Sequence, residues 1–165
     1  MAEYEIIDNF LPKDEFNNLN DAMNKDMPWF YLDSVATPDD NDKSNNSYYY
    51  FFHLLYTESM PCSPSFDIVV PLLNALKMKA LMRVKANLYP STKKIIQHDS
   101  HVDFPYKHKG ALFSINTCDG CTVLDDGTRI DSVANRLLLF DSSKEHSSTT
   151  CTNDKVRMNI NINYF

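Results

Sequence analysis

Residues 156–163 read Val156-Arg157-Met158-Asn159-Ile160-Asn161-Ile162-Asn163, with apolar and polar side chains in strict alternation. Successive residues of a β-strand point to opposite faces, so this stretch predicts a strand with one apolar face. Arg157 shares the other face with three asparagines. If that face turns into the protein, the guanidinium needs an anionic partner, and its planar fork suits a carboxylate. The alternative is an edge strand whose Arg and Asn side chains face water.

Upstream of this stretch, short strand candidates follow one another closely. Turn signals at Asp119-Gly120 and Asp126-Gly127 separate some of them, and all three glycines lie in this half of the chain. Several short strands at close spacing predict a barrel or a two-sheet jelly roll. The predicted strands cover residues 84–89, 111–116, 122–124, 137–140 and 156–165.

The N-terminal half predicts a mixed support of strands and helices. A short strand over residues 4–7 precedes a helix in which Phe16, Leu19 and Met23 recur at helical spacing, with Pro12 near its start. The aromatic run 48–56 predicts another strand, and the apolar periodicity of residues 66–82 predicts a second helix.

Residues 33–47 are rich in Asp, Asn, Ser and Pro and carry no periodicity, which predicts a solvated loop. The functional alternative for this loop is a lid over an active site.

Composition fits one domain that spans all 165 residues. The net charge of −6, with no basic run, argues against a dedicated nucleic-acid surface. The first residues lack the pattern of a signal peptide, and no apolar segment is long enough to cross a bilayer. We therefore expect a cytoplasmic protein without a membrane partner, whose four cysteines are mostly reduced.

The triplet His101-Val102-Asp103 is a candidate metal-binding pair. In an extended segment both side chains point to one side, so they can approach one ion together. A third ligand from His98, His108 or His146 would complete a two-histidine, one-carboxylate triad, which leaves positions on iron open. A surface His and Asp in a polar loop would give the same triplet.

An arginine that follows the last of these histidines by 11 positions makes the pattern more specific (His146 and Arg157). The order H-x-D, distal His and Arg resembles the 2-oxoglutarate and Fe(II)-dependent dioxygenase superfamily. It is most similar to the prolyl-4-hydroxylase-like branch and its compact microbial and phage-type members. Further motifs that resemble the family are residues 4–11, 88–90, 113–116, 119–122 and 135–140.

The resemblance implies a mainly β protein, a double-stranded β-helix of the jelly-roll or cupin type. Residues 83–165 would form its core and residues 1–82 its support. Fe(II) would be held by His101, Asp103 and His146, and Arg157 would hold the far carboxylate of 2-oxoglutarate. The implied activity is hydroxylation with O2, with release of succinate and CO2, and with ascorbate as an optional accessory reductant.

Further contacts to the co-substrate are implied for Tyr89 and Asn87 on one strand and for Ser114 and Asn159. Ser114 stands where the prolyl-hydroxylase branch often has a Tyr, and Asn159 stands where some relatives have a Ser. The substrate would be a peptide or a small molecule, with a prolyl residue as the first expectation. Arg83 and Lys85 would reach a substrate if their strand faces the mouth of the barrel, and otherwise would face solvent.

Two other functions fit the sequence less well. Cys118 and Cys121, with Cys151 and His146, could form the zinc site of a binding module, or the CxxC could be a redox dithiol. We favour a tight hairpin turn at Asp119-Gly120 as the reason for this motif. A cupin-like barrel that binds a small ligand without oxygen chemistry shares the predicted architecture.

Overall fold

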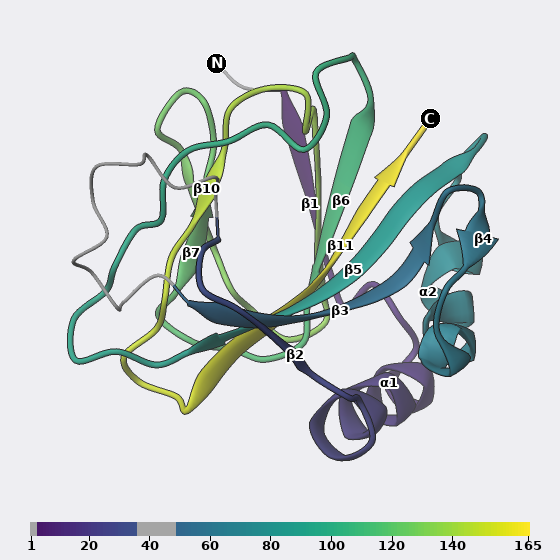
Figure 1. Ribbon diagram of the computed structural model, residues 1–165, viewed down its shortest axis with the longest axis horizontal. Coiled ribbons are helices and arrows are strands. Elements are labelled where there is room, and N and C mark those ends of the chain that lie inside the picture. Colours follow the sequence, from purple (N-terminus) through teal and green to yellow (C-terminus); the bar gives the residue numbers. More distant parts are fainter. Residues whose placement is uncertain (1–2, 36–48) are drawn as a thin grey trace.

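The computed structural model describes residues 3–35 and 49–165. Two β-sheets face each other, and two helical segments cover the outer side of the larger one (Figure 1). Most of the predicted solvated loop of residues 33–47, for which a lid was the alternative, lies outside the described residues, since residues 36–47 are not described. The elements in chain order are β1 (Tyr4–Asp8), α1 (Lys13–Lys25), β2 (Phe30–Leu32), β3 (Tyr50–Thr57), β4 (Met60–Pro61), the 3-10 helix η1 (Pro64–Val69), α2 (Val70–Ala75), β5 (Leu81–Pro90), β6 (Lys109–Ser114), β7 (Cys121–Val123), β8 (Arg129–Asp131), β9 (Arg136–Phe140), β10 (Ser147–Ser148) and β11 (Val156–Tyr164).

The larger sheet is antiparallel and has the order β1-β9-β6-β11-β5-β3-β2, with β4 paired to β3. The predicted alternating strand is β11, and it lies in the middle of this sheet between β5 and β6. The smaller sheet has the order β10-β7-β8. This pair of facing sheets confirms the expected jelly roll.

The apolar face of β11 packs toward the helices. Ile160 and Ile162 are fully buried there, in one cluster with Leu19 and Met23 of α1 and Leu72 of α2. A second, smaller cluster fills part of the space between the two sheets and comprises Leu112, Leu124, Ile130, Leu138 and Phe140. The polar face of β11 therefore turns inward, toward the smaller sheet.

The predicted helix over residues 66–82 is wrong in its second half. The helical segments η1 and α2 end at Ala75, and Leu76 is already extended. The backbone N–H groups of Lys79 and Ala80 donate instead to the carbonyl oxygen of Phe165. Residues 79–80 thus pair with the C-terminal residue of the chain, which the local periodicity alone could not show.

The predicted hairpin turn at Asp119-Gly120 is also wrong, because these residues lie in a longer connection from β6 to β7. A Cβ atom at Gly120 would stand 2.7 Å from Cδ of Arg157 and 2.7 Å from the carbonyl oxygen of Thr150. Close packing against Arg157 therefore explains this glycine. The second predicted turn is confirmed, since Gly127 has a φ of 83° between β7 and β8.

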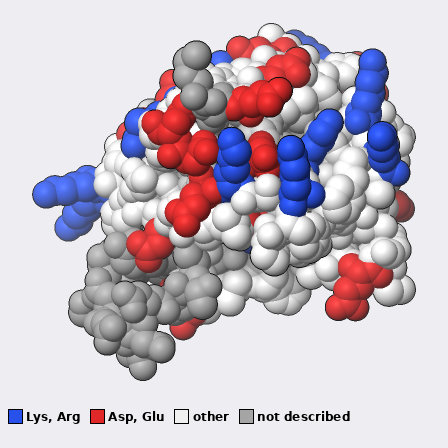
Figure 2. All heavy atoms as spheres, turned by 90° about the horizontal axis from the view of Figure 1, so that it is seen from above, with Lys and Arg blue, Asp and Glu red and all other residues white. Residues whose placement is uncertain are grey.

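In the described part of the chain, no helix is long and apolar enough to cross a membrane. Charged side chains of both signs share the face seen in Figure 2, where Lys and Arg lie among Asp and Glu.

We predict that Phe113→Ala lowers the free energy of unfolding by about 3–5 kcal/mol, because it leaves a cavity in the main core. Phe113 is fully buried, and its ring meets those of Phe10 and Phe16 edge-on at 6.3 and 6.1 Å. Urea denaturation measures the loss. The matched control is Phe30→Ala, at a residue that is 54% exposed, with an expected loss below about 1 kcal/mol. Equal losses in the two variants would contradict this placement of the core.

Candidate metal centre

The segment that carries His101 and Asp103 is joined to the distal histidine by its backbone. The N–H group of His101 donates to the carbonyl oxygen of His146 at 2.9 Å, and the N–H group of His146 donates back at 3.0 Å. This isolated antiparallel bridge sets the two imidazole rings 4.8 Å apart between centroids. Residues 45 positions apart therefore present their side chains to one point.

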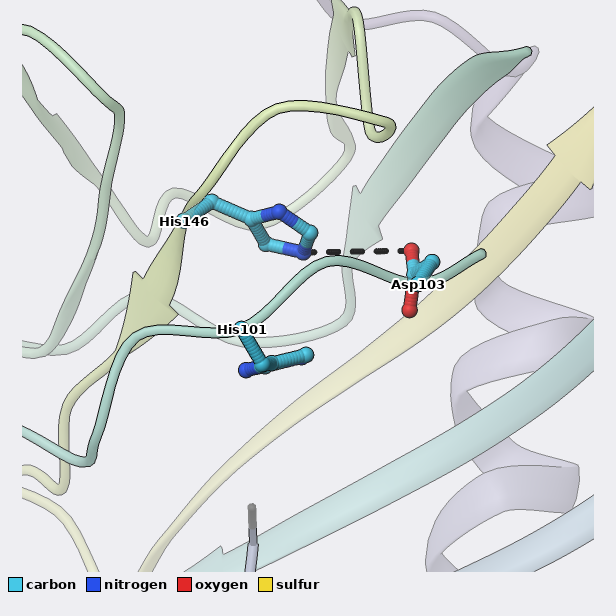
Figure 3. A group of neighbouring side chains, drawn as sticks. All are labelled: His101, Asp103 and His146. Atoms are coloured by element: carbon cyan, nitrogen blue, oxygen red, sulfur yellow. Dashed lines mark ion pairs between the residues drawn. The ribbon is translucent and has the colours of Figure 1, made fainter. Parts of the chain in front are cut away.

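Figure 3 shows the three side chains directed toward a common space. One ligand atom from each of His101, Asp103 and His146 lies within 4.8 Å of the other two. Two imidazole nitrogens and one carboxylate oxygen form the facial triad typical of non-haem iron. Among the described residues, this is the one group of His, Cys, Asp and Glu side chains with such spacing.

Both histidines are prepared to bind a cation. Nδ1 of His146 lies 3.0 Å from the carbonyl oxygen of Lys144, and because a carbonyl only accepts, Nδ1 carries the proton. Nε2 of His146 then keeps its lone pair and faces Asp103 at 3.8 Å. Burial, together with the neighbouring His146, lowers the pKa of His101, so its imidazole is neutral at pH 7.

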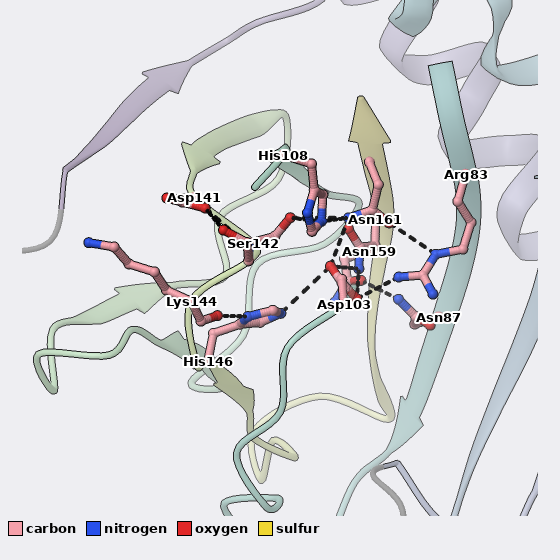
Figure 4. A network of polar contacts seen from close by, with 12 residues as sticks. Arg83, Asn87, Asp103, His108, Asp141, Ser142, Lys144, His146, Asn159 and Asn161 are labelled. Carbon is pink, nitrogen blue, oxygen red and sulfur yellow. Dashed lines mark hydrogen bonds and ion pairs between the residues drawn. The ribbon is translucent and has the colours of Figure 1, made fainter. Parts of the chain in front are cut away.

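Asp103 is held by side chains of the larger sheet (Figure 4). Its Oδ1 accepts a hydrogen bond from Arg83, and its Oδ2 accepts from Asn161 at 3.1 Å and from Asn163 at 2.9 Å. Burial by itself raises the pKa of this carboxyl, but Arg83, His146 and the two amides outweigh burial and hold the pKa well below its usual range. Asp103 is therefore an ionised carboxylate with a fixed orientation, as a candidate metal ligand requires.

The structure separates the three histidines that the sequence left open as third ligand. His98 contacts Ser148 through Nδ1 at 2.8 Å, and its ring lies against Tyr89. His108 contacts Ser142 through Nε2 at 2.8 Å. Neither belongs to the triad, so His146 is the distal member.

Arg157 is buried, with 1% of its surface exposed, and it lies on the inward face of β11, which is the first of the two alternatives that the sequence left open. Its guanidinium donates to the carbonyl oxygen of Thr149 at 3.2 Å and to the hydroxyl of Thr122 at 2.9 Å, and it lies 5.7 Å from the ring centre of Tyr89. Nε has no hydrogen-bond partner. In the described part of the chain, no carboxylate pairs with this cation. An edge strand open to water is therefore excluded.

The other residues predicted to contact the co-substrate lie on the inner wall, which is the face of the larger sheet that turns toward the smaller sheet. On this wall the inward residues of neighbouring strands lie opposite one another in rows. Asn159 lies opposite Asn87 on β5 and accepts a hydrogen bond from its amide at 3.0 Å. Both line the cavity that also contains Tyr89, His101 and His146. Ser114 lies opposite Asn159 on β6 and is buried, but it does not line this cavity.

Two residues that the sequence left between substrate and solvent belong to the inner wall. Arg83 lies opposite Asn163 and bonds to Asp103, and Lys85 lies opposite Asn161 and lines the cavity. Arg83 and Lys85 precede Asn87 and Tyr89 at spacings of two along β5, so all four side chains point to the same face of the strand. The sequence contained this signal, but it did not show that β5 pairs with β11.

The cysteines do not form a metal site. Cys118, Cys121 and Cys151 are buried and free, and they are absent from the metal-binding group. The sequence-based zinc alternative therefore has no support in the described structure.

We predict that His101→Ala and Asp103→Ala each weaken the binding of Fe(II) or Mn(II) by more than about 100-fold, since loss of a ligand exceeds the usual cost of outer contacts. Calorimetric titration under nitrogen gives the affinity. His53→Gln is the control, because His53 is bonded to the carbonyl oxygen of Pro28 and the hydroxyl of Ser63 outside the triad. Tight metal binding that survives both alanine variants would rule out this centre.

Comparisons with known proteins agree with the architecture. No protein-family model matches the chain, and no curated protein matches it in sequence. Among solved structures, a prolyl hydroxylase of Trichoplax adhaerens, in complex with a peptide fragment of hypoxia inducible factor, covers 100% of this chain and 84% of its own, with a TM-score of 0.69 at 16% identity. A viral collagen prolyl hydroxylase from Paramecium Bursaria Chlorella virus-1, in complex with 2-oxoglutarate, covers 98% and 96%, with a TM-score of 0.62 at 14% identity. An alpha-ketoglutarate-dependent epimerase from nogalamycin biosynthesis covers 99% and 78%, with a TM-score of 0.67 at 12% identity. The chain has the fold of these non-haem oxygenases.

Proposed function

We propose that this protein is a 2-oxoglutarate- and O2-dependent Fe(II) oxygenase that hydroxylates its substrate and releases succinate and CO2. The observation that carries the proposal is that the buried guanidinium of Arg157 has no anionic partner in the described part of the chain. A buried cation without an anionic partner is costly, and natural proteins keep such features where a ligand needs them. Arg157 lies on the same wall as the side chains that hold Asp103.

The metal would be held by His101, Asp103 and His146. Iron(II) bound there would supply the activation of O2 and the oxidation of a substrate C–H bond, with 2-oxoglutarate as the source of electrons. The protein's own contribution is position. The His101–His146 bridge fixes two ligands, and Arg83, Asn161 and Asn163 fix the third.

The co-substrate would bind lengthwise along the wall made by β5 and β11. Arg157 would receive the carboxylate far from the metal in a bidentate contact, and the hydroxyl of Thr122 already orients the guanidinium. Tyr89, Asn87 and Asn159 would line its path. Ser114 would not contact the co-substrate, and would act only as the neighbour of Asn159 in the adjacent strand.

The substrate would be an amino-acid side chain, with a prolyl residue as the first candidate. Support comes from the two prolyl hydroxylases of the same fold, one of which binds a peptide. The epimerase of the same fold carries different chemistry, so the fold leaves small molecules open as substrates. Ascorbate would serve only as an accessory reductant.

We predict that the purified protein with Fe(II) and O2 converts 2-oxoglutarate to succinate slowly without a substrate, and faster with the right one. Mass spectrometry follows succinate and detects the added oxygen across a screen of peptides and metabolites. His101→Ala and Asp103→Ala should abolish turnover. Persistent turnover in both variants would disprove the assignment, and 2-oxoglutarate binding without any turnover would indicate a binding module instead.

We predict that Arg157→Met weakens 2-oxoglutarate binding by about 2–5 kcal/mol, the usual loss when a buried charge pair loses one partner. The same change should lower the free energy of unfolding by no more than about 1 kcal/mol, because an apolar residue of similar size often replaces a buried charge at little cost. Calorimetry and urea denaturation give the two quantities. Arg129→Met, at an exposed residue, should change neither. Unchanged affinity in Arg157→Met would refute the role of Arg157.

A further inference from the structure

Lys85 is the one Lys or Arg among the described residues that line the cavity, and the metal triad does not use it. It lies on β5 opposite Asn161 and lines the cavity together with His101 and His146. Its ammonium nitrogen lies 5.7 Å from the ring centre of Tyr50. Among the described residues, no carboxylate forms an ion pair with Lys85, so the ammonium group lies near the face of an aromatic ring and lacks a directly paired anion.

The ammonium group stays charged at neutral pH. Burial, with a smaller effect of Arg83, lowers the pKa of Lys85 to about 8, while Asp103 acts in the opposite direction. Most molecules therefore carry the proton at pH 7. A partly buried and charged lysine gains most from an anionic partner that enters the cavity.

The charges of the proposed reaction do not satisfy Lys85. An Fe(II) dication, a 2-oxoglutarate dianion, Asp103 and Arg157 cancel one another. Arg83, which is paired with Asp103, and Lys85 then leave the region around the cavity with a formal surplus of positive charge, although the chain as a whole has a net charge of −6.

Two hydrogen-bond acceptors stand beside this cation. The side-chain oxygens of Asn161 and Asn87 are buried and have no hydrogen-bond partner. Both residues lie on the same wall, Asn161 opposite Lys85 and Asn87 two positions along β5. A buried acceptor without a donor is costly, so both oxygens favour a ligand that brings N–H groups.

We propose that Lys85 binds the carboxylate of the prime substrate, and that this substrate is a small molecule with an amino group near that carboxylate, of which a free α-amino acid is the simplest. Asn161 and Asn87 accept hydrogen bonds from the amino group. The proposal rests on the oxygenase function above and narrows its substrate class. Lys85 is then a residue for substrate specificity, and Arg157 remains the residue for the co-substrate.

The test measures two affinities in three variants. Lys85→Met removes the charge at similar length, Lys85→Arg keeps it, and Lys13→Met makes the same change at an exposed lysine of α1. Calorimetry with Fe(II) under nitrogen gives the affinity for 2-oxoglutarate. Equilibrium dialysis with mass-spectrometric detection, with Fe(II) and 2-oxoglutarate present, gives the affinities for free amino acids, their α-amides and blocked dipeptides.

We expect at least one free amino acid to bind wild type and Lys13→Met, and its α-amide to bind about tenfold more weakly or worse. Lys85→Met should lose this preference for the carboxylate, and Lys85→Arg should keep it. The affinity for 2-oxoglutarate should change by less than about twofold in all three variants.

Several results would overturn the proposal while leaving the oxygenase function intact. These are equal binding of acid and amide, a preference that survives in Lys85→Met, binding of blocked dipeptides alone, or no amino acid bound. A loss of 2-oxoglutarate affinity in Lys85→Met would reassign the residue to the co-substrate. Wild type that fails to bind 2-oxoglutarate at all would instead overturn the proposed function.

Discussion

The carboxylate of Asp103 lies between two parts of the chain that are far apart in sequence. Its Oδ1 accepts from Arg83 of β5, and its Oδ2 accepts from Asn161 and Asn163 of β11 while facing His146. Oδ1 thus contacts a fixed cation and Oδ2 faces His146, while the amide of Asn161 reaches both oxygens. The ring contact of His98 with Tyr89 and the position of Arg83 over the Phe104 ring also attach the loop that carries His101 and Asp103 to the larger sheet. The contacts of Asp103 differ from these because they act directly on a member of the triad and fix its orientation.

Some cations of the inner wall have an anionic partner and others do not, and this differs from one row of the sheet to the next. In the row of Arg83 and Asn163 the cation is neutralised by Asp103. In the row of Lys85 the nearby anion is the same Asp103, which is bonded to Asn161 but forms no ion pair with Lys85, and in the row of Arg157 the described chain has no anion. A sheet with uncompensated cations sacrifices stability, and natural proteins accept such a loss where binding requires it. The wall is therefore neutral where it holds a protein ligand of the metal and positive where small anions would bind.

The alternating sequence of β11 predicted the strand, its apolar face and the row of polar residues that includes Arg157. Local pattern sufficed there because a strand period of two is visible within eight residues. The direction of the polar face needed tertiary information, since a solvated edge strand has the same pattern. The H-x-D pair was predicted, but the choice of His146 over His98 and His108 from the residues alone was not possible. That choice depends on a backbone bridge across 45 positions.

Other features were out of reach for a definite physical reason. Strands of two or three residues, such as β8 and β10, are too short to show a period. The glycine at position 120 was read as a turn residue, yet its reason is the side chain of Arg157, 37 positions away. The helix over residues 66–82 was predicted too long because its apolar spacing continues into a segment that pairs with the C-terminus. For Gly120 and for residues 66–82, a contact between distant residues overrode the local signal.

The pairing of β5 with β11 also constrains what can react. Successive inward residues on a strand are separated by about 6.6 Å, so the rows of Arg157, Asn159, Asn161 and Asn163 are regularly spaced along β11. A co-substrate anchored at Arg157 reaches toward the triad past Asn87 and Asn159, and Lys85 lies one row beyond them. A substrate anchored at Lys85 would therefore lie two rows from Arg157, beside the row through which Asn161 holds Asp103. Two anions held in separate rows of one strand pair would both lie beside the space between His101, Asp103 and His146, which is the proximity that a reaction between co-substrate, oxygen and substrate requires.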